Sequence, residues 1–190
     1  MDQDEVLAVL RVLQATGMRL WVTGGWGIDA LVGRQTREHR DRDLLVEAQR
    51  LAECLSLLAA RGYAEETDLL PVRVEVVAAK RGWVDVHPVR LAADGSGMQA
   101  GLNGTRFDYP ADCFATGNLA GREVPRLTAA HQRLLHTGYE PRPQDVHDLG
   151  LLNELNPRIP PDGPALRRWS SSKHQEASIE DPQVTLQPVG

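Results

Sequence analysis

Cysteine is scarce in this chain, and long hydrophobic runs are missing. The two cysteines, Cys54 and Cys113, lack the C-x-x-C spacing of a zinc site. Cys54 falls within a helical apolar pattern, which favours a buried thiol. No stretch approaches the roughly 18 consecutive apolar residues that a membrane span needs. The acidic start M-D-Q-D-E-V-L also lacks the apolar core of a signal peptide, so we expect a cytoplasmic protein with no membrane partner.

Basic residues are fewer than acidic ones, 21 against 26. The formal net charge of -5 argues against a general affinity for nucleic acid, which would require a basic face, and we expect no nucleic-acid partner. The basic residues are nearly all arginine, and Arg34, Arg37 and Arg40 lie close together. Arginine suits planar, bidentate contacts with phosphate. A local phosphate pocket is therefore compatible with an acidic chain.

Alternating patterns of apolar residues predict a mixed fold around one core, which 190 residues can support. The patterns predict helices over 6–13, 28–32, 48–60, 128–136 and 144–155, and strands over 20–23, 41–46, 72–79 and 83–89. Residues 92–121 are rich in Gly, Asn and Asp and predict loops with short elements. We expect an α/β (α+β) fold with a core over 1–110, a helical C-terminal part over 111–156 and a mobile tail over 157–190.

The most informative segment is 23–44, which reads T-G-G-W-G-I-D-A-L-V-G-R-Q-T-R-E-H-R-D-R-D-L. Gly24 and Gly25 follow a strand and precede a short helix. Without a Cβ they let the backbone approach a phosphate closely, and the helix aims free N–H groups at it. Asp41 and Asp43 alternate along the next strand and so share one face. Two carboxylates beside a phosphate pocket suit Mg²⁺ shared with a nucleoside triphosphate.

A third carboxylate comes from the strand over 83–89. Asp85 is expected to join the metal ligands, to accept the proton of an attacking hydroxyl, or both. His87 shares its face and is a competing base, because its unperturbed pKa lies near neutrality. Arg37 and His39 precede the aspartates and are the candidates for contacting the triphosphate. Asp29 is expected to bridge the first helix to the arginine-rich loop.

Each of these signals also has a structural interpretation when taken alone. A lone Gly-Gly usually marks a tight turn, and a lone D-x-D is usually a solvated loop. Their combination between two strands favours a functional site. His87 precedes Pro88, so packing at a strand end is an alternative role for it. Packing or surface roles are expected for three further histidines: His131, His136 and His147.

The segment 23–44 resembles the signature of the small antibiotic nucleotidyltransferases of the polymerase-β-like superfamily. The short lincosamide nucleotidyltransferases are the first likeness, and the aminoglycoside nucleotidyltransferases are the second. The resemblance spans roughly residues 6–155 and continues through G-W-V-D-V-H-P-V (82–89), A-A-D-G-S (92–96), H-T-G-Y-E (136–140) and D-V-H-D-L (145–149).

This resemblance implies a minimal nucleotidyltransferase sheet followed by a helical part. It implies that Gly24 and Gly25 form the nucleotide-binding turn, that Asp41 and Asp43 hold Mg²⁺, and that Asp85 completes the triad as general base. The implied reaction transfers NMP, with AMP expected, from an NTP such as ATP to a hydroxyl of a lincosamide antibiotic, and releases pyrophosphate. A homodimer fits the family.

Other functions stay open at this point. An aminoglycoside acceptor would need carboxylates around its pocket, and candidates are Glu65, Glu66, Asp68 and Glu75. A protein-modifying transferase and a non-catalytic nucleotide-binding or toxin–antitoxin module are further alternatives. One residue departs from the family pattern: Arg42 stands between the two aspartates where an apolar residue is usual. Its side chain should face the core, where it would snorkel or pair with an acid.

Overall fold

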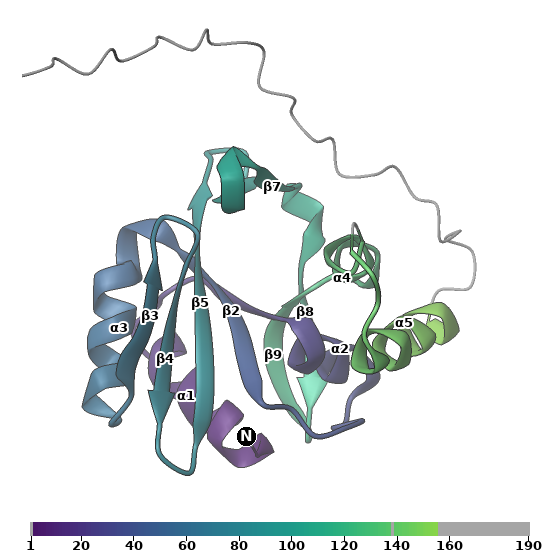
Figure 1. The fold of residues 1–190 in the computed structure, drawn as a ribbon, viewed down its shortest axis with the longest axis horizontal. Helices are drawn as coiled ribbons and strands as arrows, with labels where there is room; N and C mark the ends of the chain where they lie inside the picture. Colours follow the sequence, from purple (N-terminus) through teal and green to yellow (C-terminus); the bar gives the residue numbers. More distant parts are fainter. Residues whose placement is uncertain (1, 138, 156–190) are drawn as a thin grey trace, which may run out of the picture.

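A single mixed sheet of nine strands organises the molecule in a computed structural model that describes residues 2–137 and 139–155. The strands are β1 (Leu20–Thr23), β2 (Asp41–Glu47), β3 (Ala64–Leu69), β4 (Arg73–Ala78), β5 (Gly82–Leu91), β6 (Gly97–Ala100), β7 (Arg106–Tyr109), β8 (Phe114–Leu119) and β9 (Arg122–Leu127). Their order is β3-β4-β5-β2-β1-β9-β8, and β6 and β7 extend from β5 (Figure 1). The predicted tail over 157–190 lies outside the described residues.

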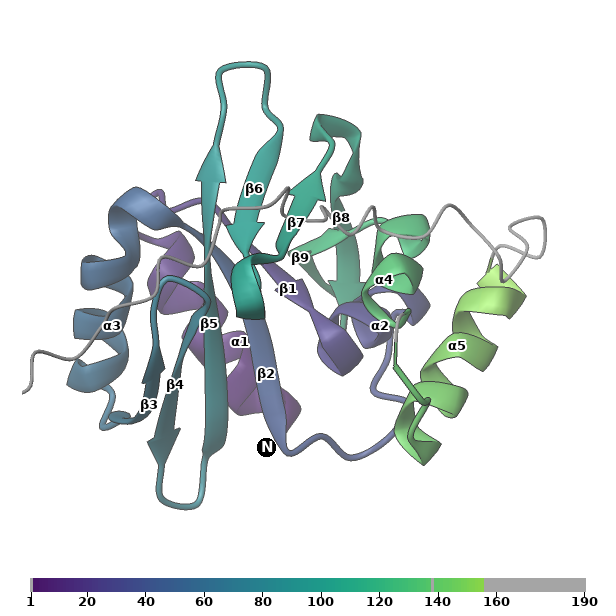
Figure 2. The same cartoon turned by 45° about the horizontal axis from the view of Figure 1, so that its top comes forward.

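Five α-helices within the described residues flank this sheet. They are α1 (Gln3–Gln14), α2 (Gly24–Val32), α3 (Leu51–Ala60), α4 (Ala129–Leu135) and α5 (Pro143–Leu155), and a short 3-10 turn, Ala48–Arg50, leads into α3. Figures 1 and 2 show α3 beside β3 and β4 at one end of the molecule and α2, α4 and α5 gathered at the other. None of the described helices combines the length and the apolar composition needed to cross a bilayer.

The main core fills one face of the sheet beneath α1 and α3. Its buried residues include Val9 and Leu13 of α1, Leu58 of α3, and Leu44 and Val86 of the two central strands. Side chains of a strand alternate between its faces, so the neighbours of these strand residues point the other way. The opposite face of β2 and β5 therefore carries the acidic residues, next to a second apolar cluster made by Leu45, Val89, Tyr109, Cys113 and Leu127.

The expected α/β class is confirmed, and several boundaries differ from the expected ones. The helix predicted over 28–32 begins at Gly24 itself and ends at Gly33, whose φ of +91° is easily adopted only without a Cβ. The loops expected over 92–121 instead contain β6, β7 and β8. Residues 114–127 form β8 and β9, so the helical part expected from residue 111 begins only at Ala129.

Arg42 lies on the core face of β2 and is fully buried, which confirms the expected orientation. It does not reach solvent, and the charge of Glu5 acts on it. Tyr63 is its hydrogen-bond neighbour, and the Tyr63 hydroxyl donates to Glu5 Oε1 at 3.1 Å. Arg61 Nη2 donates to both Glu5 oxygens at 2.9 and 3.0 Å. Burial lowers the pKa of Arg42 to about 10, against the opposing effects of Tyr63 and Glu5.

Arg42→Ile is expected to raise the free energy of unfolding by about 1 kcal/mol, because an apolar side chain avoids the desolvation of a buried cation. Glu5 keeps Arg61 and Tyr63 as partners in this variant. Glu5→Gln is the comparison, and it should destabilise because it removes the negative charge between Arg42 and Arg61. Urea unfolding followed by circular dichroism measures both. A large destabilisation by Arg42→Ile would contradict this account of the buried network.

Candidate active site

Parallel pairing of β2 and β5 brings the predicted carboxylates together. Asp43 is the register partner of Asp85, and Leu45 is the partner of His87. One ligand atom from each of Asp43, Asp85 and His87 can be chosen so that all lie within 4.8 Å of one another. Asp41 is on the same face of β2 but pairs with Trp83, and it is not a member of this group. The centre of the site is therefore Asp43, with Asp85 and His87 beside it.

Asp85 has the most perturbed carboxylate of the site. Burial and the neighbouring charge of Asp43 raise its pKa to about 6, although Arg73 and His87 act in the opposite direction. Arg73 Nη1, from β4, donates to Asp85 Oδ2 at 2.5 Å and to Glu75 Oε2 at 2.9 Å. The other oxygen, Asp85 Oδ1, is buried and has no hydrogen-bond partner.

These residues fit a divalent cation. A buried carboxylate oxygen with no donor is costly unless a cation or a proton meets it. Asp43 and Asp85 offer the hard oxygen ligands that Mg²⁺ prefers, whereas His87 offers a nitrogen that suits this ion less well. The donor set therefore supports Mg²⁺ held by the aspartates, with His87 beside it.

A buried relay orients His87. The Tyr109 hydroxyl donates to Gln99 Oε1 at 2.7 Å, and Gln99 Nε2 lies 3.1 Å from His87 Nδ1. An amide NH₂ only donates, so it leaves Nδ1 as an acceptor and places the imidazole proton on Nε2. His87 Nε2 lies 3.4 Å from Asp43 Oδ1. In this tautomer His87 donates toward Asp43, which favours Asp85 over His87 as the base.

The charge state of Asp43 follows from these neighbours. Its burial opposes ionisation, but the hydrogen bond from His87 and the charges of His87, Arg73 and His136 hold its pKa below the usual value. Asp41 behaves differently: burial and the charge of Asp43 raise its pKa, and Arg40 only partly compensates. Asp43 is thus the carboxylate most firmly kept as an anion at this site.

The glycine turn packs directly against the acidic centre. Gly24 has a φ of +58°, and a Cβ placed there would overlap Asp43 Oδ2. A Cβ on Gly25 would overlap the His39 ring and Arg37 Nη2. The side chain of Thr23, the residue before α2, makes no capping hydrogen bond. The first amides of α2 therefore keep their capacity to bind an anion.

Arg37 and His39, the predicted triphosphate contacts, are both engaged with buried acids. Arg37 Nε and Nη2 donate to the Asp148 carboxylate of α5 at 2.9 and 2.6 Å. His39 Nε2 lies 2.5 Å from Asp29 Oδ2 of α2. Asp29 Oδ1 also accepts from the Thr36 amide and hydroxyl at 3.0 and 2.6 Å, so Asp29 bridges the helix to the loop as expected. These contacts brace the glycine turn, and phosphate binding by Arg37 or His39 stays a prediction.

A cavity of about 460 Å³ opens over this centre. Its lining includes Gly24, Asp43 and His87 of this centre, together with a largely apolar set: Val72, Leu102, Phe107, Tyr109 and Leu135. Arg73, Gln99, His136, Tyr139 and Arg142 supply its other polar groups. None of these five polar residues was predicted as a site residue. The H-T-G-Y-E segment was the available signal for His136 and Tyr139.

A glycine turn at a helix start and paired aspartates on adjacent parallel strands of an open mixed sheet define the nucleotidyltransferase class. A family model described as aminoglycoside-2''-adenylyltransferase matches residues 5–152. The chain belongs to this family, and it is a nucleotidyltransferase. This confirms the resemblance to the antibiotic nucleotidyltransferases.

Individual relatives include proteins that act on two classes of antibiotic. A lincosamide resistance protein of Staphylococcus haemolyticus is 33% identical over 153 residues, which is 80% of this chain and 95% of the relative. A 2''-aminoglycoside nucleotidyltransferase of Escherichia coli is 31% identical over 134 residues, 65% of this chain and 68% of the relative.

Solved structures agree with these relatives. The lincomycin-bound lincosamide antibiotic adenylyltransferase LnuA has a TM-score of 0.76 and 32% identity, covering 82% of this chain and 98% of its own. ANT(2'')-Ia in complex with adenylyl-2''-tobramycin has a TM-score of 0.65 at 19% identity, covers 80% of this chain and 89% of its own, and supports the fold alone.

Proposed function

We propose that this protein transfers AMP from ATP to a hydroxyl of a lincosamide, with Mg²⁺ bound, and releases pyrophosphate. The observation that carries the proposal is the buried, unpartnered Asp85 Oδ1, on a residue that is the register partner of Asp43, which lines the cavity. The adenylyl group is supported by LnuA, which is described as an adenylyltransferase.

The acidic residues of the site have separate roles in this reaction. Asp85 accepts the proton of the antibiotic hydroxyl while the hydroxyl oxygen forms a bond to the α-phosphorus of ATP. The bond between the α-phosphorus and the oxygen that bridges to the β-phosphate breaks, and pyrophosphate leaves. A pKa of about 6 leaves Asp85 ionised near neutral pH yet basic enough to take a proton. Asp43 and Asp85 would hold Mg²⁺, with Asp41 as a further predicted ligand. When bound, the ion supplies neutralisation of the phosphate charge.

The lining of the cavity favours a lincosamide over an aminoglycoside. A polycationic acceptor needs several carboxylates, and the four acids considered for this role do not line the cavity. Glu75 pairs with Arg73, and Glu66 accepts from Trp83 Nε1 at 2.6 Å. Asp68 accepts from the Leu70 amide. The cavity instead presents cationic Arg73, which disfavours a polycation, and an apolar wall, which suits an acceptor that carries an alkyl group.

Incubation with Mg²⁺, ATP and lincomycin, clindamycin or kanamycin, followed by mass spectrometry, tests the proposal. An added AMP on lincomycin or clindamycin, and none on kanamycin, is the expected result. Modification of kanamycin alone would move the acceptor to the aminoglycosides. Mass added only to protein would replace the proposal with a protein-modifying activity.

Phe107→Ala is expected to raise the KM for lincomycin about tenfold, because a large apolar side chain of the acceptor wall contributes roughly 1.5 kcal/mol of contact. The KM for ATP should change less than twofold. Leu69→Ala is the matched control, since Leu69 is 41% exposed and lies outside the cavity lining. Steady-state kinetics with each substrate varied in turn measures both constants. An equal rise in the KM for lincomycin and the KM for ATP would argue against Phe107 as part of the acceptor wall.

A further inference from the structure

His136 follows α4 and has an acid behind its ring. Its Nδ1 lies 3.4 Å from Asp145 Oδ1 of α5 and 3.2 Å from the Tyr139 hydroxyl. The Asp145 side chain is 2% exposed and is also bound by Arg142, whose Nε donates at 2.9 Å. The imidazole is therefore held in one orientation by a buried anion. The sequence predicted a packing or surface role for this residue.

The other ring nitrogen of His136, Nε2, indicates that this residue binds a ligand. The His136 side chain is 9% exposed, and its Nε2 is buried without a hydrogen-bond partner. His136 also lines the cavity that contains Gly24 and Asp43. Of the described residues that line this cavity, it is the one with such a buried, unpartnered polar atom. A buried nitrogen left in this state is costly until a ligand meets it.

The groups around His136 indicate which part of the nucleotide its Nε2 would contact. Asp43 Oδ1 faces His87, while Asp43 Oδ2 lies against Gly24, so the glycine turn and β5 flank opposite oxygens of Asp43. α4 packs against α2, the helix that begins at the glycine turn. The start of α2 carries a partial positive charge, and Arg142 lines the same cavity. These two positive groups around one cavity suit a polyphosphate.

We propose that His136 binds the β- and γ-phosphates of the nucleotide, and the pyrophosphate product, with a proton on each ring nitrogen in the complex: Nε2 donates to the phosphates while Nδ1 donates to Asp145. The inference rests on the proposed function, since it assigns a residue to the leaving group of that reaction. Arg37 and His39 then brace the turn from behind through Asp148 and Asp29, and His136 contacts the phosphates directly.

A pair of substitutions separates the two ring nitrogens. Asn in place of His136 keeps a polar group near Nδ1 and lacks Nε2, whereas Gln places an amide nitrogen near Nε2. The experiment is calorimetric titration of the full chain with inorganic pyrophosphate in Mg²⁺ buffer, and separately with lincomycin. His136→Asn should weaken pyrophosphate binding about tenfold or more, the loss of one charge-assisted hydrogen bond. His136→Gln should recover much of that loss, and lincomycin affinity should stay within twofold.

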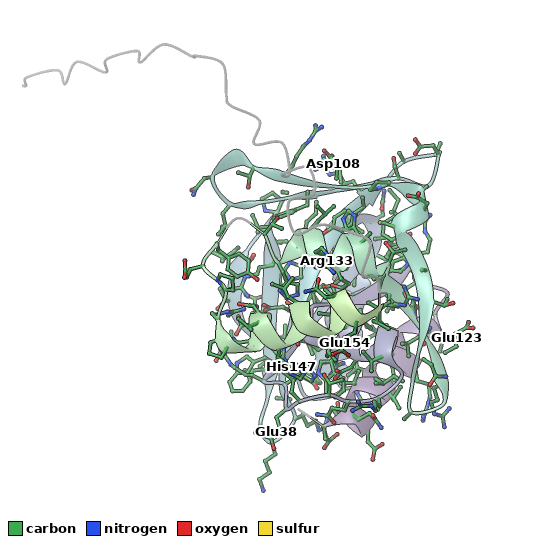
Figure 3. The ribbon with its side chains drawn as sticks, turned by 90° about the vertical axis from the view of Figure 1, so that its right-hand side faces the viewer. Glu38, Asp108, Glu123, Arg133, His147 and Glu154 are labelled. Carbon is green, nitrogen blue, oxygen red and sulfur yellow. The ribbon has the colours of Figure 1, made fainter. Side chains whose placement is uncertain are left out.

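His147→Asn is the matched control. His147 is exposed on α5, on the face shown in Figure 3, with its Nε2 3.3 Å from Thr36 Oγ1 and outside the cavity lining. It should leave pyrophosphate affinity unchanged.

Three results would overturn the proposal: no pyrophosphate binding by the unmodified protein, unchanged pyrophosphate affinity in His136→Asn, or weakened binding of lincomycin alone. If the protein binds pyrophosphate through His136 but modifies no antibiotic, the assignment of His136 stands and the proposed acceptor fails. The two hypotheses therefore fail separately.

Discussion

Asp43→Asn is expected to lower kcat/KM for lincomycin about a thousandfold or more, with little change in the fold. Asp43 is the carboxylate that both Asp85 and His87 approach, and it is the one most firmly held as an anion. An amide lacks the charge that binds a divalent cation and that raises the pKa of Asp85. Loss of a preorganised electrostatic group commonly costs a factor of 10²–10³, and loss of the metal would add to it.

The stability of this variant distinguishes a catalytic loss from unfolding. Neutralising Asp43 loses its attraction to His87 and Arg73 but relieves its repulsion of Asp85, so the two effects partly offset and the thermal midpoint should fall by only a few degrees. Asp108→Asn is the control, because Asp108 is an exposed acid on β7 with a side chain that is 60% exposed (Figure 3). Steady-state kinetics and thermal unfolding of the three proteins give the comparison. Turnover of Asp43→Asn within tenfold of the unmodified protein would refute the assigned metal site.

Gly24→Ala is expected to reduce transfer at least a hundredfold and to destabilise the fold by about 2 kcal/mol. Two effects add at this position. The φ of +58° costs an L residue roughly 1 kcal/mol, and the new Cβ would overlap Asp43 Oδ2. The aspartate must therefore move away from its place beside Asp85 and His87, which disturbs the geometry on which transfer depends.

Gly17→Ala separates strain from overlap. Gly17 has a φ of +74° and lies after α1, and a Cβ there would meet nothing within 4 Å. This variant should lose stability by about 1 kcal/mol and keep its activity. Chemical unfolding and kcat/KM are measured for both variants. Equal activity losses in Gly17→Ala and Gly24→Ala would show that the contact with Asp43 is irrelevant.

Local sequence signals sufficed for the strands around the site. The short apolar run of β1, the D-x-D of β2 and the β4–β5 hairpin were all predicted, because each has a pattern that its own residues carry. β3 was missed because A-E-E-T-D-L lies at the sheet edge and is mostly exposed. β6 and β7 are four residues each, too short for an alternation to show.

The residues of the site also fall into two groups, those predicted from local sequence and those found only in the structure. Gly24, Asp43 and Asp85 were predicted because a glycine turn and a D-x-D stand together between two strands, and that combination favours a functional site. Asp41 was predicted with them and lies outside the group of Asp43, Asp85 and His87. Arg73, Gln99 and Tyr109 have ordinary surroundings in the sequence. They became part of the site through strand pairing, because β4 pairs with the first half of β5 and β6 pairs with its end.

The chain by itself determined the class of chemistry, because the glycine turn and the alternating aspartates are local patterns whose physical purpose can be read within a few residues. Only the tertiary structure decided which groups meet. It placed Asp43 opposite Asp85, since parallel register depends on the whole sheet. It turned Arg37 and His39 toward buried acids and His136 toward the cavity, since those contacts join residues that are far apart in sequence or lie on different helices.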